Sequence, residues 1–392
     1  MLSPEEQLAL LRVGSAKILS EEELLKKLRL GKPLRVKLGV DPTAPDIHLG
    51  HSVSLSKLRQ FQDLGHEAIL IIGDFTSMIG DPSGRSTTRP QLTHDEVMAN
   101  ARTYTEQAFK ILDHERTKTV FNGEWFEMMT FQEVIKLNSR VTLQQMLQRE
   151  DFKERMEKNQ PVRAHEIQYP IMQGWDSVMI KADVEIGGTD QLFNILVGRD
   201  LQKEEGLPQQ VALMVPILEG LDGVQKMSKS LNNYIGVNED PITMFGKVMS
   251  ISDELMVRWY ELLFQETLDA SLHPMDAKKA LARRLVERFH SVADAEHALQ
   301  DFATRFSARK LEDSDSLPVL DLSDIGTDVI AIVVAAYERG FQLTKSKSDV
   351  RRLIEGGSVQ LAGEKFTNLK TPVVLASGQV LKLDKTRAIR VA

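Results

Sequence analysis

The sequence has no cysteine among its 392 residues, which excludes disulfide bridges, a cysteine nucleophile and thiolate metal ligands. It also lacks an apolar run long enough to cross a membrane, and no charged and then apolar leader precedes the first expected helix. These absences favour a cytoplasmic protein without a membrane partner. What is present is an ordinary globular composition, 42% hydrophobic and 27% charged, in a chain long enough for two or three domains.

The net charge of -7 is unevenly distributed along the chain. From Phe341 to Ala392 there are ten Lys and Arg residues and four Asp and Glu residues, a balance of +6 that leaves -13 for residues 1–340. A basic terminal segment on an acidic body is the asymmetry expected of a protein that binds a polyanion at one end. The sequence therefore predicts a nucleic-acid partner for its C-terminal segment.

Apolar, strand-like runs alternate with helical patterns over the first 230 residues. Such alternation is typical of a parallel sheet covered by helices, so we expect an α/β fold with a Rossmann-like sheet. The expected strands cover 34–40, 67–72, a run that starts at Val184, and 211–218. Helices are expected within 3–30, at 48–64 and at 93–112, and past residue 230 at 241–249, 252–264, 274–290 and 293–308.

The segment after the first strand is the first candidate site. Asp41-Pro42 and Ala44-Pro45 prevent helix formation, so the chain turns before a helix begins near His48. A helix N-terminus is a natural phosphate site because its N–H groups are unpaired and its dipole end is positive. His48 and His51, three residues apart, would project from one face, and Gly50 lets a flat ligand approach the backbone. Taken alone, the pattern also fits two surface histidines.

A second candidate site is the basic segment Lys226-Met-Ser-Lys-Ser230, which follows the strand-like run 211–218 and a glycine-rich turn. By itself it also fits a solvated loop. Together, in this order and spacing, the histidine and lysine segments resemble the paired ATP signatures of class I aminoacyl-tRNA synthetases. In that family these side chains hold the triphosphate from two sides and stabilise the charge that moves onto the leaving pyrophosphate. Nucleotidylyltransferases share the histidine signature, but they are shorter and lack the other motifs.

Further motifs resemble the tyrosyl branch of this family. Ile79-Gly-Asp-Pro-Ser-Gly84 matches a loop in which the Asp, here Asp81, meets the amino group of the amino acid, and Arg85 occupies the place of a mobile phosphate-contacting cation. The stripe formed by Tyr169, Gln173 and Asp176 matches the amino-acid pocket. Pro170 suggests that Tyr169 lies at or before the first turn of its helix.

The segment 184–191 runs from strand through glycines to a helix start, and tryptophanyl enzymes share its Asp-Gln pair. This segment therefore indicates the tyrosyl and tryptophanyl families together. Tyr169 and Asp176 favour the tyrosyl family over the tryptophanyl one. The resemblance implies a set of catalytic residues: His48, His51, Lys226, Lys229, Thr43 and Arg85. It implies an ATP-binding set: His48, Gly50, His51, Gly188, Asp190, Lys226, Met227, Ser228, Lys229 and Ser230. It implies a tyrosine-binding set: Lys37, Gly39, Asp41, Asp81, Tyr169, Gln173, Asp176 and Gln191.

Within the tyrosine set, Asp176 and Tyr169 would read the side chain, while Asp81, Gln173 and Gln191 would hold the ammonium group. Lys37 departs from the family, whose commoner version has a tyrosine there that shares the substrate hydroxyl. A lysine could donate to the same hydroxyl or pair with a nearby carboxylate. We expect pairing, because an ammonium beside the hydroxyl would weaken the O–H donor that Asp176 needs.

The rest of the resemblance concerns domains and partners. It implies a catalytic domain over 1–232 with a helical, dimer-forming insertion around 120–165, for which a solvated helical face is the alternative. It further implies a helical anticodon-side domain over 233–322, a linker or helix over 323–340 and an S4-like RNA-binding domain over 341–392. Within that last domain, the helix after Ser348 would present basic residues to RNA phosphates. The RNA-binding set is Lys345, Lys347, Arg351 and Arg352.

The implied reaction joins L-tyrosine to AMP from ATP and then transfers the tyrosyl group to tyrosine tRNA. The resemblance is to bacterial enzymes and implies a homodimer. Mg²⁺ should accompany ATP and be held largely by phosphate and water, with no metal site built from protein alone and no tightly held cofactor. Two alternatives remain at this stage. One is a tryptophanyl enzyme, disfavoured by Asp176 and the S4-like segment, and the other is a catalytically silent RNA-binding protein, disfavoured by the intact signatures.

Overall fold

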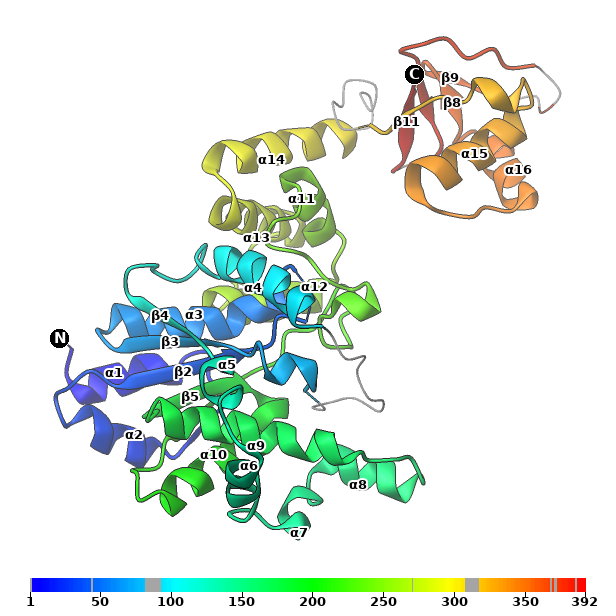
Figure 1. Ribbon diagram of the computed structural model, residues 1–392. Coiled ribbons are helices and arrows are strands. Elements are labelled where there is room, and N and C mark those ends of the chain that lie inside the picture. The colour runs from blue at the N-terminus through cyan, green and yellow to red at the C-terminus, as the bar shows by residue number, and fades with distance from the viewer. Residues whose placement is uncertain are drawn as a thin grey trace. The chain divides into compact units, whose positions relative to one another are not determined.

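The computed structural model describes residues 2–43, 45–81, 93–269, 271–306, 317–366, 369, 372–384 and 386–392 (Figure 1). The chain divides into two compact units. The first comprises Met1–Glu239 and Ser250–Leu281, and the second comprises Asp240–Met249 and Ala282–Ala392. Arg85, which was predicted to contact phosphate, lies outside the described residues.

The first unit is built on a six-stranded sheet in the order β1-β6-β5-β2-β3-β4. Neighbouring strands from β6 to β4 are parallel, and β1 joins the edge antiparallel to β6. The predicted parallel α/β sheet is therefore confirmed. Its strands are β1 Lys17–Leu19, β2 Arg35–Val40, β3 Glu67–Ile72, β4 Thr117–Phe121, β5 Val184–Gly188 and β6 Val211–Val215.

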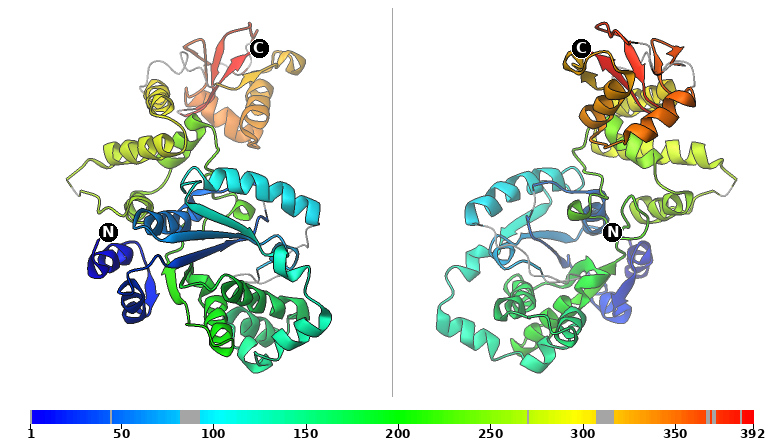
Figure 2. Two further views of the ribbon diagram at one scale, coloured as in Figure 1. Left: turned by 60° about the vertical axis from the view of Figure 1, so that its left-hand side comes forward. Right: turned by 90° about the vertical axis from the view of Figure 1, so that its right-hand side faces the viewer.

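Helices cover both faces of this sheet, with α3 and α4 on one face and α9 and α10 on the other (Figures 1 and 2). The apolar side chains of α3 at Leu55, Leu58 and Phe61 are fully buried and, at intervals of three residues, form the apolar face of the helix that was expected at 48–64. The helices of this layer and of the N-terminus are α1 Pro4–Arg12, α2 Glu21–Leu28, α3 Leu49–Asp63, α4 His94–Ala108, α9 Ala164–Met179 and α10 Leu192–Glu204.

Helix α9 corrects one prediction. It begins at Ala164, so Tyr169 lies in its second turn and Pro170 lies inside the helix. A proline there removes one backbone hydrogen bond, to the carbonyl of Glu166, and costs roughly 3 kcal/mol. Ten buried residues along α9, among them Ile171 and Gln173, supply the packing that keeps the helix continuous.

Short helices connect β4 to α9, in agreement with the predicted helical insertion. Thr130 and Thr142 cap two of them through their hydroxyl oxygens. These helices are α5 Gly123–Phe126, α6 Phe131–Asn138, α7 Leu143–Met146 and α8 Glu150–Glu157. The first unit also contains α12 Asp253–Trp259, a π-helical turn at Tyr260–Phe264, and the start of α13 Pro274–Phe289.

The second unit contains α11 Pro241–Met249, the end of α13, and α14 Val292–Phe306. The rings of Phe245 and Phe302 lie 5.5 Å apart where α11 packs on α14. The succession of helices predicted after residue 230 is thus confirmed.

The C-terminal part of the second unit has its own five-stranded sheet, in the order β7-β11-β10-β8-β9. One apolar cluster runs from Leu322 through Ile332 to Val391 and joins this sheet to two helices. The elements are β7 Val319–Leu320, α15 Val329–Phe341, α16 Lys347–Glu355, β8 Gln360–Leu361, β9 Glu364–Lys365, β10 Val380–Lys382 and β11 Ala388–Val391.

Two local expectations in this part were wrong. Helix α16 is capped by Ser346 and not by Ser348, because the Ser346 hydroxyl is the one that accepts from Asp349 N. The sequence of residues 373–383 also predicts a closing hairpin, but the hairpin does not begin at Val373, whose backbone N–H donates to the carbonyl of Thr327. The hairpin is formed instead by β10 and β11, and β10 also pairs with β8.

Candidate active site

The strand order of the first unit creates a crevice between β2 and β5. From these neighbours the chain continues to opposite sides of the sheet, and ligands of such sheets bind beyond the carboxyl ends of the strands at this switch point. Asp41 follows β2 directly, and Asp190 and Gln191 follow β5. A cavity of about 500 Å³ lies here, and its lining includes Asp41, Thr43, Asp46, His48, Gly50, His51, Asp81, Gly188, Asp190, Gln191 and all five residues of 226–230.

The two histidines stand at the first turn of α3. His48 is the N-cap residue, and its Nδ1 accepts the backbone N–H of Gly50 at 3.2 Å. The backbone N–H of His48 donates to Nδ1 of His51 at 3.2 Å, and the two rings stack with centroids 3.8 Å apart. A Cβ at Gly50 would lie 2.9 Å from Cε1 of His48, so a side chain there would disturb the ring. The prediction that both imidazoles share one face is confirmed.

Both histidines are neutral at physiological pH. Burial, followed by the charges of His51 and Lys229, lowers the pKa of His48 to about 2. Burial, followed by the charges of Lys229 and Lys226, lowers the pKa of His51 to about 4. Because each Nδ1 accepts a backbone N–H, the single proton of each neutral ring resides on Nε2. The pair therefore offers two preoriented neutral donors to an anion.

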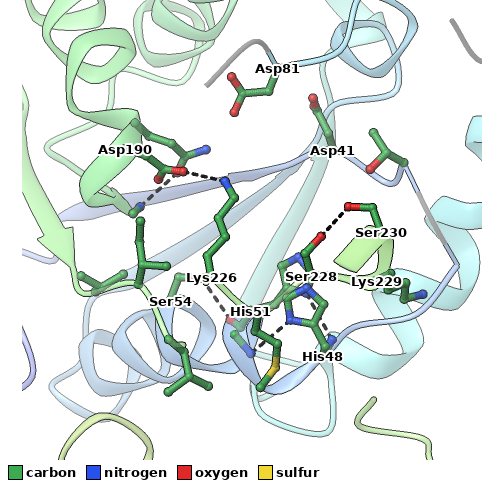
Figure 3. A pocket seen from close by; sticks show the side chains of 18 of the residues that line it. Asp41, His48, His51, Ser54, Asp81, Asp190, Lys226, Ser228, Lys229 and Ser230 are labelled. Atoms are coloured by element: carbon green, nitrogen blue, oxygen red, sulfur yellow. Dashed lines mark hydrogen bonds and ion pairs between the residues drawn. The ribbon is translucent and has the colours of Figure 1, made fainter. Parts of the chain in front are cut away.

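The lysine segment lies on the same cavity as the histidines, and Figure 3 shows Lys226 paired with Asp190. Lys226 Nζ lies 3.2 Å from Asp190 Oδ2, and Lys229 Nζ lies 2.9 Å from Asp46 Oδ2. Neither pair is deeply buried, so each is exchangeable for a phosphate oxygen at modest cost. Asp46 was not predicted as part of the site, since a single carboxylate in a loop carries no sequence signal.

Asn233 holds the lysine segment in place and was also missed by the sequence. Its Oδ1 accepts the backbone N–H of Ser228 at 2.8 Å, and its Nδ2 donates to the carbonyl of Lys226 at 3.2 Å. A Cβ on Gly220 would lie 2.3 Å from the Asn233 side chain. The glycine-rich turn before the lysine segment therefore makes room for the amide that fixes the segment.

A second, small cavity of about 20 Å³ lies beside the first. Eight of its ten lining residues belong to the tyrosine stripe, the end of β2 and the turn after β3: Gly39, Val40, Asp41, Gly73, Thr76, Tyr169, Gln173 and Asp176. The Tyr169 hydroxyl donates to Asp41 Oδ2 at 2.8 Å, and the Thr76 hydroxyl donates to Asp41 Oδ1 at 2.9 Å. The structure thus brings the three stripe residues together beside the carboxylate that follows β2.

Asp176 is a strongly perturbed carboxyl group of this cavity. Burial raises its pKa to about 7, against the opposing influence of Lys37 and of hydrogen bonds from Asn122 and Trp125. The indole Nε1 of Trp125 lies 3.1 Å from Asp176 Oδ1, and the amide Nδ2 of Asn122 lies 3.3 Å from Oδ2. Asn122 directly follows β4 and Trp125 lies in α5, and neither was predicted. A carboxyl group poised near neutrality in a closed pocket is typical of a functional site.

Lys37 is paired with a carboxylate, as expected. Its Nζ lies 2.9 Å from Glu185 Oε1, and the two residues are register partners on the adjacent strands β2 and β5. Nζ also donates to the carbonyl of Gln173 at 2.7 Å and to the Ser177 hydroxyl at 2.8 Å. The lysine is fully buried and is absent from the lining of both cavities.

The predicted RNA-binding residues lie in the second unit, around α16. Arg351 and Arg352 are exposed on this helix, and Arg352 lies 3.1 Å from Asp349. Lys345 Nζ lies 5.7 Å from the ring centroid of Tyr337. Within the described residues no group of three or more His, Asp or Glu side chains is arranged to hold a metal ion. Among all the residues that the structure describes, no helix is long and apolar enough to span a membrane.

Comparison with known proteins agrees with this geometry. The model of the family "tRNA synthetases class I (W and Y)" matches residues 29–319. The chain therefore belongs to the class I tRNA synthetases of the tryptophan and tyrosine type. Tyrosine–tRNA ligase of Moorella thermoacetica is 51% identical over 98% of this chain and 95% of that protein. Tyrosine–tRNA ligase of Aquifex aeolicus is 48% identical over 100% of this chain and 99% of that protein. Within its class, the chain belongs to the bacterial tyrosine–tRNA ligases.

A solved structure shows the same fold at lower identity. The tyrosyl-tRNA synthetase of Archaeoglobus fulgidus, crystallised with L-tyrosine, superimposes with a TM-score of 0.61. It is 24% identical, and the alignment covers 76% of this chain and 99% of that one. This likeness supports the class I synthetase fold of the sheet and its helices.

Proposed function

We propose that this chain activates L-tyrosine with ATP, releasing pyrophosphate, and transfers the tyrosyl group from the adenylate to the 3′ end of tyrosine tRNA. The observation that carries the proposal is the meeting of two motif sets in one crevice. The histidines of α3 and the lysine segment line the larger cavity, and Asp176 with Tyr169 lines the smaller one beside it. Asp41 and Gln191 line both, so the two cavities form a continuous site.

In the first step the tyrosine carboxylate attacks the α-phosphorus of ATP, a new O–P bond forms, and the bond to pyrophosphate breaks. The attacking carboxylate is already ionised at neutral pH, so no general base is needed. The Nε2–H groups of His48 and His51 donate to the phosphates, and Lys226 and Lys229 exchange their carboxylate partners for phosphate oxygens. Catalysis is then mainly positioning and stabilisation of the negative charge that moves onto the leaving group.

The amino-acid pocket selects tyrosine through Asp176. An ionised Asp176 accepts the phenol O–H, and Asn122 and Trp125 hold the carboxylate in place from the opposite side. The ammonium group is assigned to Asp81 and Gln173, with Gln191 nearby. The smaller cavity has room for about one water molecule, so side chains around it must move when a phenol ring enters.

Mg²⁺ would accompany ATP and would be held mainly by phosphate oxygens and water, the arrangement that this cation prefers in nucleotide sites. The ion would supply charge neutralisation at the phosphates.

The tRNA is assigned to the second unit. Its C-terminal part carries the exposed Arg351 and Arg352 on a helix suited to phosphate contacts. The apolar core of this part includes Leu322 and helix α15. We therefore propose that the RNA-binding domain begins near residue 317, earlier than the boundary at residue 341 expected from the sequence.

Homodimer formation is assigned to the helical insertion. Met128 is 81% exposed, Phe131 is 79% exposed and Ile135 is 54% exposed, an apolar set concentrated around α6. Exposed apolar side chains gathered in one segment are typical of a protein interface, and burial against a second copy is the arrangement that the family resemblance suggests. The reaction needs ATP and tRNA, so we place the protein in the cytoplasm.

Aminoacylation of bacterial tRNA with labelled amino acids tests the proposal. We expect the chain to charge tRNA with tyrosine and not with tryptophan. Charging with tryptophan would assign the chain to the other branch of its family. RNA binding without charging of any amino acid would identify a catalytically silent RNA-binding protein.

A further inference from the structure

Arg149 lies at the N-terminus of α8 and is buried, with 4% of its surface exposed. It is the first residue of a chain of hydrogen bonds that leads into the amino-acid pocket. Its Nε lies 2.6 Å from Asp151 Oδ1, its Nη1 lies 2.9 Å from Asn194 Oδ1, and its Nη2 lies 3.7 Å from Asp81 Oδ1. A guanidinium presents its donors in a rigid planar fork. The oxygens of Asp151 and Asn194 are therefore held in a fixed relation to one another, and the Asp81 carboxylate is in ion-pair contact with the same guanidinium.

Asn194 connects Arg149 to Gln173, because its amide is hydrogen-bonded to both side chains. The side chain of Asn194 is fully buried on α10, and its Nδ2 donates to Gln173 Oε1 at 2.8 Å. Gln173 Nε2 in turn donates to Glu185 Oε1 at 3.0 Å. The line thus runs from an arginine, which can only donate, to an ionised glutamate, which can only accept. With its ends fixed in this way, each amide between them has one permitted orientation.

The orientation matters because Gln173 lines the smaller cavity. Its oxygen accepts one hydrogen bond from Asn194 and retains a second lone pair for another donor, whereas its NH₂ group is directed to Glu185. If the amide were reversed, the pocket would meet an N–H donor, which repels an ammonium group. Arg149 also approaches Asp81, the carboxylate assigned to the same ammonium group.

We infer that Arg149, acting through Asn194, is a positioning residue for the ammonium group of the amino-acid substrate. It keeps the oxygen of the Gln173 amide available to that group and restrains the Asp81 carboxylate beside it. The inference rests on the proposed function, because it concerns the tyrosine-binding part of the same site. It also connects the helical insertion, to which Arg149 belongs, with the pocket.

Arg155 provides a matched control on the same helix. It is also 4% exposed, and its Nη1 lies 2.7 Å from Glu166 Oε1. Both arginines stack on the ring of Phe152, at 5.3 Å for Arg149 and 6.0 Å for Arg155. Glu166 lines neither cavity. Loss of Arg155 therefore imitates the structural cost of removing a buried arginine from α8 without touching the hydrogen bonds of the pocket.

The test uses two tyrosine analogues that each lack one group. Tyramine keeps the ammonium and the phenol, and 3-(4-hydroxyphenyl)propionate keeps the carboxylate and the phenol. Their inhibition constants are measured against tyrosine in ATP–pyrophosphate exchange. We expect Arg149→Met and Asn194→Leu to weaken tyramine about tenfold to a hundredfold and to leave the propionate and the KM for ATP nearly unchanged. Arg149→Lys should recover only part of the loss, because one ammonium cannot reproduce the fork.

Arg155→Met should show no selective loss of tyramine. A second variant, Asn194→Asp, keeps the size of the side chain but presents an oxygen to Gln173, so it should produce the same selective loss even if the larger changes impair folding. Equal weakening of both analogues by Arg149→Met and Asn194→Asp, or no weakening, would overturn the inference. A wild-type protein without tyrosine-dependent exchange would instead contradict the proposed function.

Discussion

The ammonium of Lys37 and the carboxylate of Glu185 form an ion pair in the centre of the parallel sheet, 2.9 Å apart and with side chains 0% and 1% exposed. Lys37 makes two further hydrogen bonds, to the Gln173 carbonyl and the Ser177 hydroxyl. Glu185 accepts from the Gln173 amide and also from the Ser177 hydroxyl. A buried pair with this many partners is stable, but either charge alone would be costly.

We predict that Lys37→Met or Glu185→Gln alone will lower the free energy of unfolding by roughly 3–5 kcal/mol, because each leaves one buried charge without its partner. The double change Lys37→Met with Glu185→Leu should recover most of that loss, since apolar replacements of a buried pair are often neutral. Urea unfolding of the three variants measures this. Single changes that cost less than about 1 kcal/mol, or a double change that costs their sum, would contradict the coupling.

The same pair bears on substrate choice. We predict that Lys37→Met keeps the preference for tyrosine over phenylalanine, whereas Asp176→Asn reduces it about tenfold to a hundredfold, the size of one hydrogen bond to a charged group. Exchange assays with both amino acids give the two ratios. Collapse of the preference in Lys37→Met with retention in Asp176→Asn would assign the hydroxyl to the lysine.

Asp176 should also give tyrosine activation a pH dependence. With its pKa raised to about 7 by burial, the fraction ionised rises about tenfold between pH 6 and pH 8, and kcat/KM for tyrosine should rise accordingly. Asp176→Asn should flatten that profile. His48 and His51, with pKa values of about 2 and 4, do not titrate in this range. An unchanged profile in Asp176→Asn would mean that another group titrates.

The same raised pKa has the opposite effect on stability: the free energy of unfolding should fall as the pH rises. A carboxyl group whose pKa rises from 3.8 in the unfolded chain to about 7 in the folded one binds its proton more tightly when folded. Its contribution to the free energy of unfolding is present at pH 4 and is lost as the pH rises through 7. Relative to Asp176→Asn, the wild-type protein without substrate should therefore become less stable from pH 4 to pH 8.

Lys229 is predicted to act on phosphate and not on the amino acid. Lys229→Ala should lower kcat and kcat/KM for adenylation by about 10²–10³ and leave tyrosine affinity nearly unchanged, as expected for a contact made mainly in the transition state. Asp46→Asn is the matched control, because it removes the 2.9 Å partner of the lysine but keeps the lysine itself. Its effect should stay below about tenfold. A raised KM for tyrosine with kcat preserved in Lys229→Ala would contradict this role.

Removal of the C-terminal module, the part of the second unit from about residue 317 to residue 392, should separate tyrosine activation from transfer to tRNA. A chain ending at residue 306 should retain ATP–pyrophosphate exchange and lose most aminoacylation. A cut at residue 341 would leave the buried face of α15 uncovered, because Ile332, Val333 and Ala336 pack against later residues. The affinity of the full chain for tRNA should fall as the salt concentration rises. For each tenfold rise, the loss should be slightly less than one log unit per neutralised phosphate. Equal charging by the truncated chain would make the module a structural cap.

The sequence predicted the regular elements well where their apolar pattern was strong, as in the continuous apolar run of β3 and the apolar face of α3. It also predicted that Lys37 would pair, but not with which residue. Lys37 and Glu185 are distant in the sequence, and only the register of β2 on β5 makes them partners. A lysine and a glutamate inside two otherwise apolar strands were the available signal. Asn194, Asn233 and Asp46 gave none, because single polar residues in helices and loops are common and their contacts depend on tertiary packing.

ATP–pyrophosphate exchange in the presence of each of the twenty amino acids tests the central claim most directly. It reports adenylate formation without requiring the matching tRNA, and it examines the phosphate-binding and amino-acid-binding parts of the crevice together. We predict strong exchange with tyrosine, weak exchange with phenylalanine and none above background with tryptophan. Absence of exchange with every amino acid, or preferential exchange with tryptophan, would contradict the assignment of Asp176 and the signature residues to tyrosine activation.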